Sequence, residues 1–89
     1  MNNKADKSNR NITAERLNHM SQSEVIAGDM VPEESILIGL PSYWHYIVAI
    51  SHRASLRHKT IIAISFNGII YTKTFEDGVV HGWKTIQLN

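Results

Sequence analysis

The fold is indicated most clearly by three consecutive segments: Thr60–Phe66 (TIIAISF), Asn67-Gly68 and Ile69–Phe75 (IIYTKTF). Both flanking runs are rich in β-branched and aromatic residues, which suit a pleated, half-buried surface. The Asn-Gly pair between them is a strong short-range signal for a β-hairpin, because a type I′ turn needs positive φ at both central residues. The sequence therefore predicts an antiparallel hairpin in this half of the chain.

A two-residue turn also predicts how the two strands pair. One face would hold the pairs Phe66 with Ile69, Ile64 with Tyr71 and Ile62 with Lys73. The other face would hold Ser65 with Ile70, Ala63 with Thr72 and Ile61 with Thr74. The first face carries the bulkier side chains, so we expect it to face the core.

Two further strands are expected around this hairpin. Tyr43–Ser51 is apolar on both faces, with Trp44, Tyr46, Val48 and Ile50 on one and His45, Ile47 and Ala49 on the other. A strand of this kind lies centrally or beneath a neighbouring subunit. Asp77-Gly78 predicts another turn, followed by a last strand over Trp83–Leu88. We expect Trp44 and Tyr46 in the core.

The chain changes character near Gly28, from polar and helix-tolerant to rich in Ile, Val, Tyr and Thr. We expect an N-terminal arm over residues 1–28, a hinge around Gly28–Pro32 and a β-domain over residues 29–89. Thr13 would cap a short helix over Ala14–Ser23, and Pro32 would begin a brief turn or helical start. The fold class is therefore mainly β: a small antiparallel sheet of about four to five strands with a short N-terminal helical arm.

Length and composition point to oligomerisation. An 89-residue chain buries a limited share of its surface, and it has no cysteine for disulfides or zinc clusters. Four apolar residues are the candidates for oligomer contacts: Ile12, Leu17, Met20 and Ile47. Nine Lys and Arg against eight Asp and Glu argue against nucleic-acid binding. The apolar runs are too short to cross a membrane.

Catalysis is not expected. Glu33-Glu34 and Glu76-Asp77 are carboxylate pairs, but adjacent residues point apart in an extended chain. The glycines are scattered and form no phosphate-binding loop, and no nucleophile elbow is present. The five His residues show no close metal-ligand spacing. We therefore expect no enzyme, no cofactor and no metal.

The run Ser51–Lys59 (SHRASLRHK) carries three permanent positive charges and two His residues, without an acid. Such a loop suits an acidic or phosphorylated glycan, with an aromatic ring stacking on a sugar face. The candidate glycan-binding residues are Tyr43, His45, His52, Arg53, Arg57 and His58. The alternative is a plain solvated connection pinned by Leu56.

Four stretches also resemble a known family: Ile12–Met20, Leu40–Val48, Ile69–Gly78 and Gly82–Ile86. The last three resemble the knob-type repeats of phage tail fibres and pyocins, which combine an aromatic strand, a tyrosine strand, a Gly turn and a Trp-Lys. The first is similar to a helical junction in baseplate and tail-fibre proteins of phages that infect Gram-positive bacteria. The sequence departs from the family pattern at Lys73, where Arg is usual, and at Val79-Val80, which replace a Trp.

The resemblance implies a homotrimeric module of a virion tail, made in the bacterial cytoplasm, that recognises a host-surface polysaccharide or caps a fibre. Its partners would be copies of itself, other tail proteins and the polysaccharide. Two alternatives stay open: a structural or chaperone-like assembly subunit of a tail fibre, and an unrelated small interaction or regulatory module.

Overall fold

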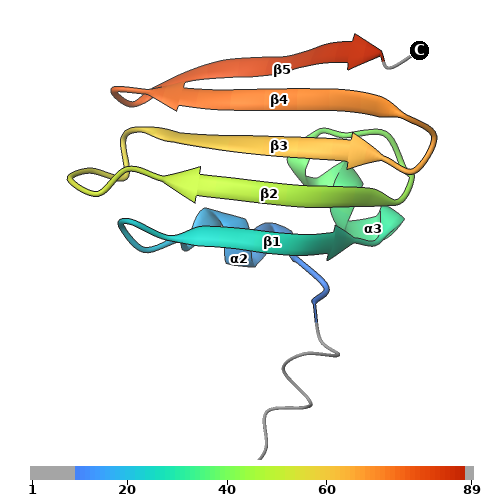
Figure 1. Cartoon of the computed structure of the whole chain (residues 1–89), viewed down its shortest axis with the longest axis horizontal. Helices are drawn as coiled ribbons and strands as arrows, with labels where there is room; N and C mark the ends of the chain where they lie inside the picture. The colour runs from blue at the N-terminus through green and yellow to red at the C-terminus, as the bar shows by residue number, and fades with distance from the viewer. Residues whose placement is uncertain (1–9, 88–89) are drawn as a thin grey trace, which may run out of the picture.

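The five strands follow one another in space in the order in which they occur in the sequence (Figure 1). The computed structural model of the protein describes residues 10–87. The strands are β1 (Val25–Met30), β2 (His45–Ser51), β3 (Lys59–Ser65), β4 (Ile69–Glu76) and β5 (Val79–Gln87). All neighbours are antiparallel. The predicted mainly β fold is confirmed.

Three short helical segments lie on one side of this sheet: α2 (Ala14–Asn18), α3 (Pro32–Ser35) and the 3₁₀ helix η1 (Ile36–Ile38). Thr13 caps α2 as predicted, because its Oγ1 accepts the N–H of Arg16 at 3.1 Å. The helix ends at Asn18 and not at Ser23, since the chain must turn into β1 and Ser23 has φ of 57°. Pro32 occupies the first turn of α3, where a missing N–H costs nothing.

The hydrophobic core lies between the helices and one face of the sheet. The helical and loop segments contribute Ile12, Leu17, Met20 and Leu40, and the strands contribute Ile26, Met30, Ile47, Ala49, Ile61, Ala63 and Tyr71. We call this the covered face of the sheet. Nothing in residues 10–87 packs on the opposite face, which we call the open face.

The expected core face of β2 is wrong. His45, Ile47 and Ala49 are buried, whereas Trp44 and Tyr46 are 42% and 54% exposed on the open face. The physical reason is space. The small side chains of Ala49 on β2 and Ala63 on β3 let the helical segments come close to the covered face. The larger aromatic rings therefore lie on the other side.

The predicted register of the β3–β4 hairpin is wrong by one residue. Ile64 lies opposite Ile70 and Ala63 opposite Tyr71, because the loop contains three residues, Phe66–Gly68. Only Gly68 of the Asn-Gly pair has positive φ, at 96°, and its N–H donates to the Ser65 carbonyl at 2.9 Å. This is a three-residue loop with glycine in the left-handed region.

The shift turns β3 over, because neighbouring strand residues point to opposite faces. Ile61, Ala63 and Ser65 are buried, and Ile62 and Ile64 lie on the open face. Ser65 stabilises the longer loop: its Oγ hydrogen-bonds Asn67 Oδ1 and accepts the N–H of Ile69. The two-residue turn with two positive φ angles occurs instead at Asp77-Gly78, at 50° and 84°, where a turn was also predicted.

The expected boundary between arm and β-domain falls inside β1, so it is wrong for the described residues. Gly28 lies opposite Ile47, and the segment before α2 runs alongside β1. Asp29 N–H donates to the Arg10 carbonyl at 3.0 Å, and Ile12 N–H donates to the Asp29 carbonyl at 2.6 Å. Residues 10–28 therefore belong to the β-domain, while residues 1–9 of the expected arm lie outside the described residues.

Candidate interaction surface

The four residues predicted to make oligomer contacts all lie in the core of the single chain. Their exposed fractions are 7% for Ile12, 1% for Leu17, 4% for Met20 and 1% for Ile47. The helical stripe is apolar because it covers the sheet of its own chain. These side chains have almost no surface left for a second molecule, so this prediction is corrected.

His45 is a core residue and has no access to a ligand at the surface. It is 0% exposed, its Nδ1 lies 2.9 Å from Ser35 Oγ, and its ring packs edge-on against Tyr71. Nε2 has no hydrogen-bond partner among the described residues. Burial lowers the pKa of His45, opposed by the hydrogen bond to the backbone of Tyr43. The ring is therefore held neutral as a structural element.

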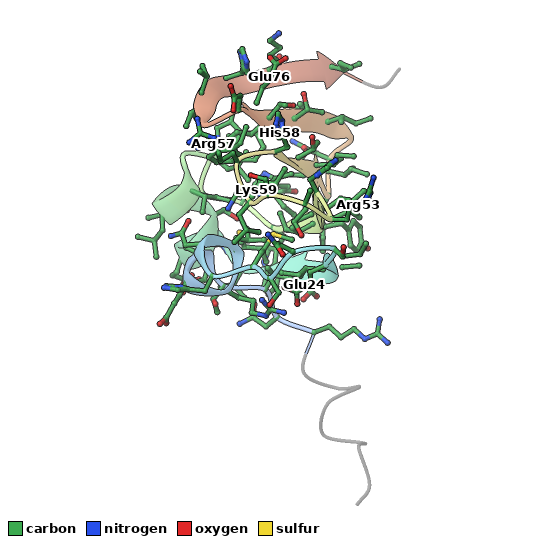
Figure 2. All side chains as sticks on the ribbon, turned by 90° about the vertical axis from the view of Figure 1, so that its left-hand side faces the viewer. Glu24, Arg53, Arg57, His58, Lys59 and Glu76 are labelled. Atoms are coloured by element: carbon green, nitrogen blue, oxygen red, sulfur yellow. The ribbon has the colours of Figure 1, made fainter. Side chains whose placement is uncertain are left out.

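The remaining glycan candidates do not form one site. Tyr43 lies before β2 and the basic loop lies after β2. The seven residues of this strand therefore separate Tyr43 from the loop by about 20 Å. The loop that carries His52, Arg53, Arg57 and His58 lies at the opposite end of the sheet, where it contacts the β4–β5 turn through the hydrogen bond from the Gly78 N–H to the Arg57 carbonyl. Figure 2 shows Arg53, Arg57 and His58 at this end. Leu56 is 44% exposed and does not pin the loop.

The two His residues of this loop lie side by side, with ring centroids 5.7 Å apart. His52 Nδ1 accepts the N–H of Ala54 at 3.0 Å, and His58 Nδ1 accepts the N–H of Asp77 at 3.2 Å. A backbone N–H is always a donor, so each neutral ring must carry its proton on Nε2. Both rings therefore offer an N–H outward and are poorly suited to bind a metal through that nitrogen.

The two arginines of the loop differ in their surroundings. Arg57 is bound to the β4–β5 turn: Nε donates to Asp77 Oδ1 at 3.1 Å, and an NH2 group donates to the Asp77 carbonyl at 2.8 Å. Arg53 forms no ion pair within residues 10–87. Figure 2 shows Arg57 toward the helices and Arg53 toward the open face. Of the two arginines of the loop, Arg53 is therefore the one that remains available on the side of the open face.

A shallow concavity of about 960 Å³ joins this loop to the open face. Its apolar floor includes Val25 and Ile50, and its rim includes His52, Arg53, His58 and Glu76. Glu76 accepts a hydrogen bond from His81 Nε2 at 3.2 Å. The rim thus carries charges of both signs beside an apolar surface.

The open face itself is unusually apolar for a surface in contact with water. Several of its large side chains are about half exposed: Val25 (64%), Trp44 (42%), Tyr46 (54%), Ile50 (47%), Phe66 (48%) and Ile86 (59%). Between them lie the partly buried Val48, Ile62, Ile64 and Ile70. Trp44 and Tyr46 both stack on Phe66, at centroid distances of 5.9 and 4.7 Å. Solvated antiparallel sheets normally place polar residues on the outer face.

Sequence reasoning found only part of this surface. The double apolar pattern of Tyr43–Ser51 did predict a strand that is central or lies beneath a neighbouring subunit. The signal that was missed is the same pattern in β3, where Ile61–Ile64 places apolar residues on both faces. Read together, the two strands indicate a sheet apolar on both sides, and contiguous exposed patches of this kind mark interaction sites.

Comparison of the chain with protein-family models, curated proteins and solved structures gives no match. Across residues 10–87, no group of three or more His, Asp or Glu residues is placed to hold a metal ion. The helices in this part of the chain are too short and polar to cross a membrane. The fold and the surface define the protein as a one-layer antiparallel meander with helices on one face and an apolar open face on the other.

Proposed function

We propose that this protein is a non-catalytic assembly module that self-associates through the open face of its sheet. The observation that supports this most directly is the set of exposed apolar side chains on β1, β2 and β5, with the partly buried apolar side chains of β3 and β4 between them. Because the helices shield the other face, a second sheet is the natural cover for this one. Two sheets packed face to face, about 10 Å apart, would give a two-layer core.

The size of the open face suits a stable dimer. Five strands at about 4.8 Å spacing and about seven residues of about 3.3 Å give a footprint of roughly 550 Å². Side-chain relief raises the accessible area above this flat value. A standard interface buries about 600–1,000 Å² on each partner, so the open face is near the required size.

The biological setting that we propose rests on the sequence resemblance to phage tail-fibre and pyocin knob modules. In that setting, self-association would join the module to a tail assembly as a structural subunit. The resemblance implies a trimer, but a flat, single, self-complementary patch favours a two-fold partner. We therefore propose a homodimer as the basic unit, with a trimer as a distinct outcome of the experiment.

The experiment is the mass in solution, measured by light scattering and native mass spectrometry over a range of concentrations. We expect a dimer for the parent protein and a monomer for Tyr46→Lys, which places a charge in the open face. The matched control is Leu37→Lys: Leu37 is 67% exposed but lies on η1, away from this face. A folded parent that stays monomeric at high micromolar concentration would refute the proposal.

A second candidate function is binding of an anionic glycan at the concavity beside the basic loop. It is favoured by one observation: Arg53 and the Nε2–H groups of His52 and His58 belong to the same rim. The guanidinium of Arg53 offers charge-assisted hydrogen bonds to phosphate or carboxylate groups, and the two imidazole N–H groups add neutral donors beside it. We expect Arg53→Ala to weaken binding of a phosphorylated oligosaccharide, and Arg57→Ala, which loses a bond to Asp77, to weaken it less. Equal binding by the Arg53→Ala variant in titration calorimetry would exclude this site.

A further inference from the structure

We propose that two copies of the chain pack open face to open face around a two-fold axis parallel to the strands, with Arg53 of each copy pairing with Glu76 of the other. This arrangement rests on the proposed self-association and specifies its geometry. It places β1 over β5 of the second copy, β2 over β4, and β3 over β3. The positions of the charged residues at the margins of the open face support this arrangement.

Four charged residues surround the apolar centre of this face. Asp29 lies on β1 opposite Tyr46, and Lys84 lies on β5 opposite Thr72. Arg53 follows the end of β2, and Glu76 ends β4. Ser51 and Phe75 both pair with Lys59, so Arg53 and Glu76 leave the sheet at nearly the same level along the strands. Each half of the sheet therefore carries one acid and one base, with Asp29 and Arg53 on the β1–β2 half and Glu76 and Lys84 on the β4–β5 half.

A rotation about an axis along β3 exchanges the two halves and keeps the level along the strands. Arg53 of one copy then lies over Glu76 of the other. Asp29 lies over the strand that carries Lys84, displaced by two residues, or about 7 Å, along it. Long side chains bridge such an offset at the rim of an interface. Because the axis is two-fold, each pair forms twice.

The other two-fold arrangement, with the axis across the strands, is less favourable for one of these charges. It places each strand over its own copy. Lys84 is level with Val48, the middle residue of β2, through the pairs Val48–Ile62, Ile62–Thr72 and Thr72–Lys84. A residue at the middle of the strands faces its own copy across such an axis, so Lys84 would lie opposite Lys84 of the second copy. Like charges placed opposite each other destabilise an interface. Charge complementarity therefore selects the axis parallel to the strands.

The test uses charge reversal at the pair that faces across the axis. Arg53→Glu gives a chain with acids at both positions, and Glu76→Arg gives a chain with bases at both. We expect each single variant to weaken its own homodimer by about tenfold or more. The double variant Arg53→Glu, Glu76→Arg restores the pairing and should dimerise within about threefold of the parent, because its charges are only exchanged.

Mixing the two single variants provides the sharpest measurement. The acidic chain faces the basic chain with both pairs satisfied, so native mass spectrometry should show a heterodimer where neither variant alone forms a homodimer. Arg57→Glu is the matched control, because Arg57 pairs with Asp77 of its own chain and lies outside the open face. Thermal unfolding of every variant verifies that the fold is retained.

The outcomes separate the two proposals. A parent that is monomeric at all concentrations overturns the proposed self-association itself. A parent dimer whose charge-reversed variants fail to form the heterodimer, or dimerise as well as the parent does, overturns the arrangement described here and leaves self-association standing. The arrangement with the axis across the strands brings Arg53 toward the aromatic end of β2 of the second copy. In that arrangement Arg53→Glu would weaken the dimer, and adding Glu76→Arg would not restore it.

Discussion

Gly28→Ala tests whether the segment before α2 is part of the fold or a separable arm. Gly28 has an ordinary strand conformation, so the cost of a side chain here is purely one of space. A Cβ at this position would come closer than 3.0 Å to the carbonyl oxygen of Arg10 and would lie 3.0 Å from two atoms of Ile12. The oxygen is backbone, so it cannot rotate away as a flexible side chain would.

The magnitude follows from the two ways in which the chain can respond. If residues 10–12 stay in place, overpacking costs about 1–3 kcal/mol. If they move away, two hydrogen bonds worth about 0.5–1.5 kcal/mol each are lost, together with about 1.5–3 kcal/mol from the burial of Ile12. The chain takes the cheaper response, and the overlap is with a backbone atom, so we expect a loss in the upper part of the first range, about 2–3 kcal/mol. That corresponds to a fall in Tm of roughly 10–20 °C for a domain of this size.

The assay is urea denaturation followed by circular dichroism and tryptophan fluorescence. The matched control is Gly82→Ala on β5, where an added Cβ meets nothing within 4 Å. An alanine there should leave stability unchanged or raise it by up to about 1 kcal/mol. If Gly28→Ala unfolds within about 0.5 kcal/mol of the parent, the packing of residues 10–12 on β1 is not what supports this strand.

Three further predictions concern the core and the turns. Burial lowers the pKa of His45, so the unfolded chain binds a proton more readily than the folded one; stability is complete above the ordinary pKa of about 6.5 and falls as the pH drops below it. Urea titrations from pH 7.5 down to pH 5 give the slope of the unfolding free energy against pH. This slope should be smaller for His45→Leu than for the parent, by the equivalent of about one proton at most, and identical slopes would contradict this. Ser35→Ala removes the hydroxyl that contacts His45 Nδ1 and the carbonyls of Val31 and Tyr43, and should cost about 1–3 kcal/mol, measured in the same way. Gly68→Val places a β-branched residue at φ of 96° with open space around it, so backbone strain alone should lower the unfolding free energy by about 1–3 kcal/mol, whereas a parent-like melt would contradict the left-handed conformation.

The elements that depend on local chemistry could be predicted from the order of the residues alone. β-branched and aromatic runs predicted β2, β3 and β4, the strand predicted over Trp83–Leu88 covers the second half of β5, and Asp77-Gly78 predicted the turn between the last two. The Thr13 cap and the Pro32 helical start were also predicted, because the hydrogen bond and the fixed φ that make them lie within one turn of the chain. For the candidate site, the sequence placed His52, Arg53, Arg57 and His58 in one loop. It did not separate Arg57, bound to Asp77, from Arg53, which faces the open side.

Which face of each strand is covered became clear only from the packing of the helices on the sheet. The residues of β2 and β3 are apolar on both sides, so alternation did not distinguish the faces, and one extra residue in the Phe66–Gly68 loop reversed β3. The strand β1 was missed because Gly28 and Asp29 read as a hinge, although Gly28 is required by the close approach of Arg10. Both decisions arise from contacts between residues distant in the chain. A period of two specifies a pleated strand, and the helices that pack on one side of it specify its buried face.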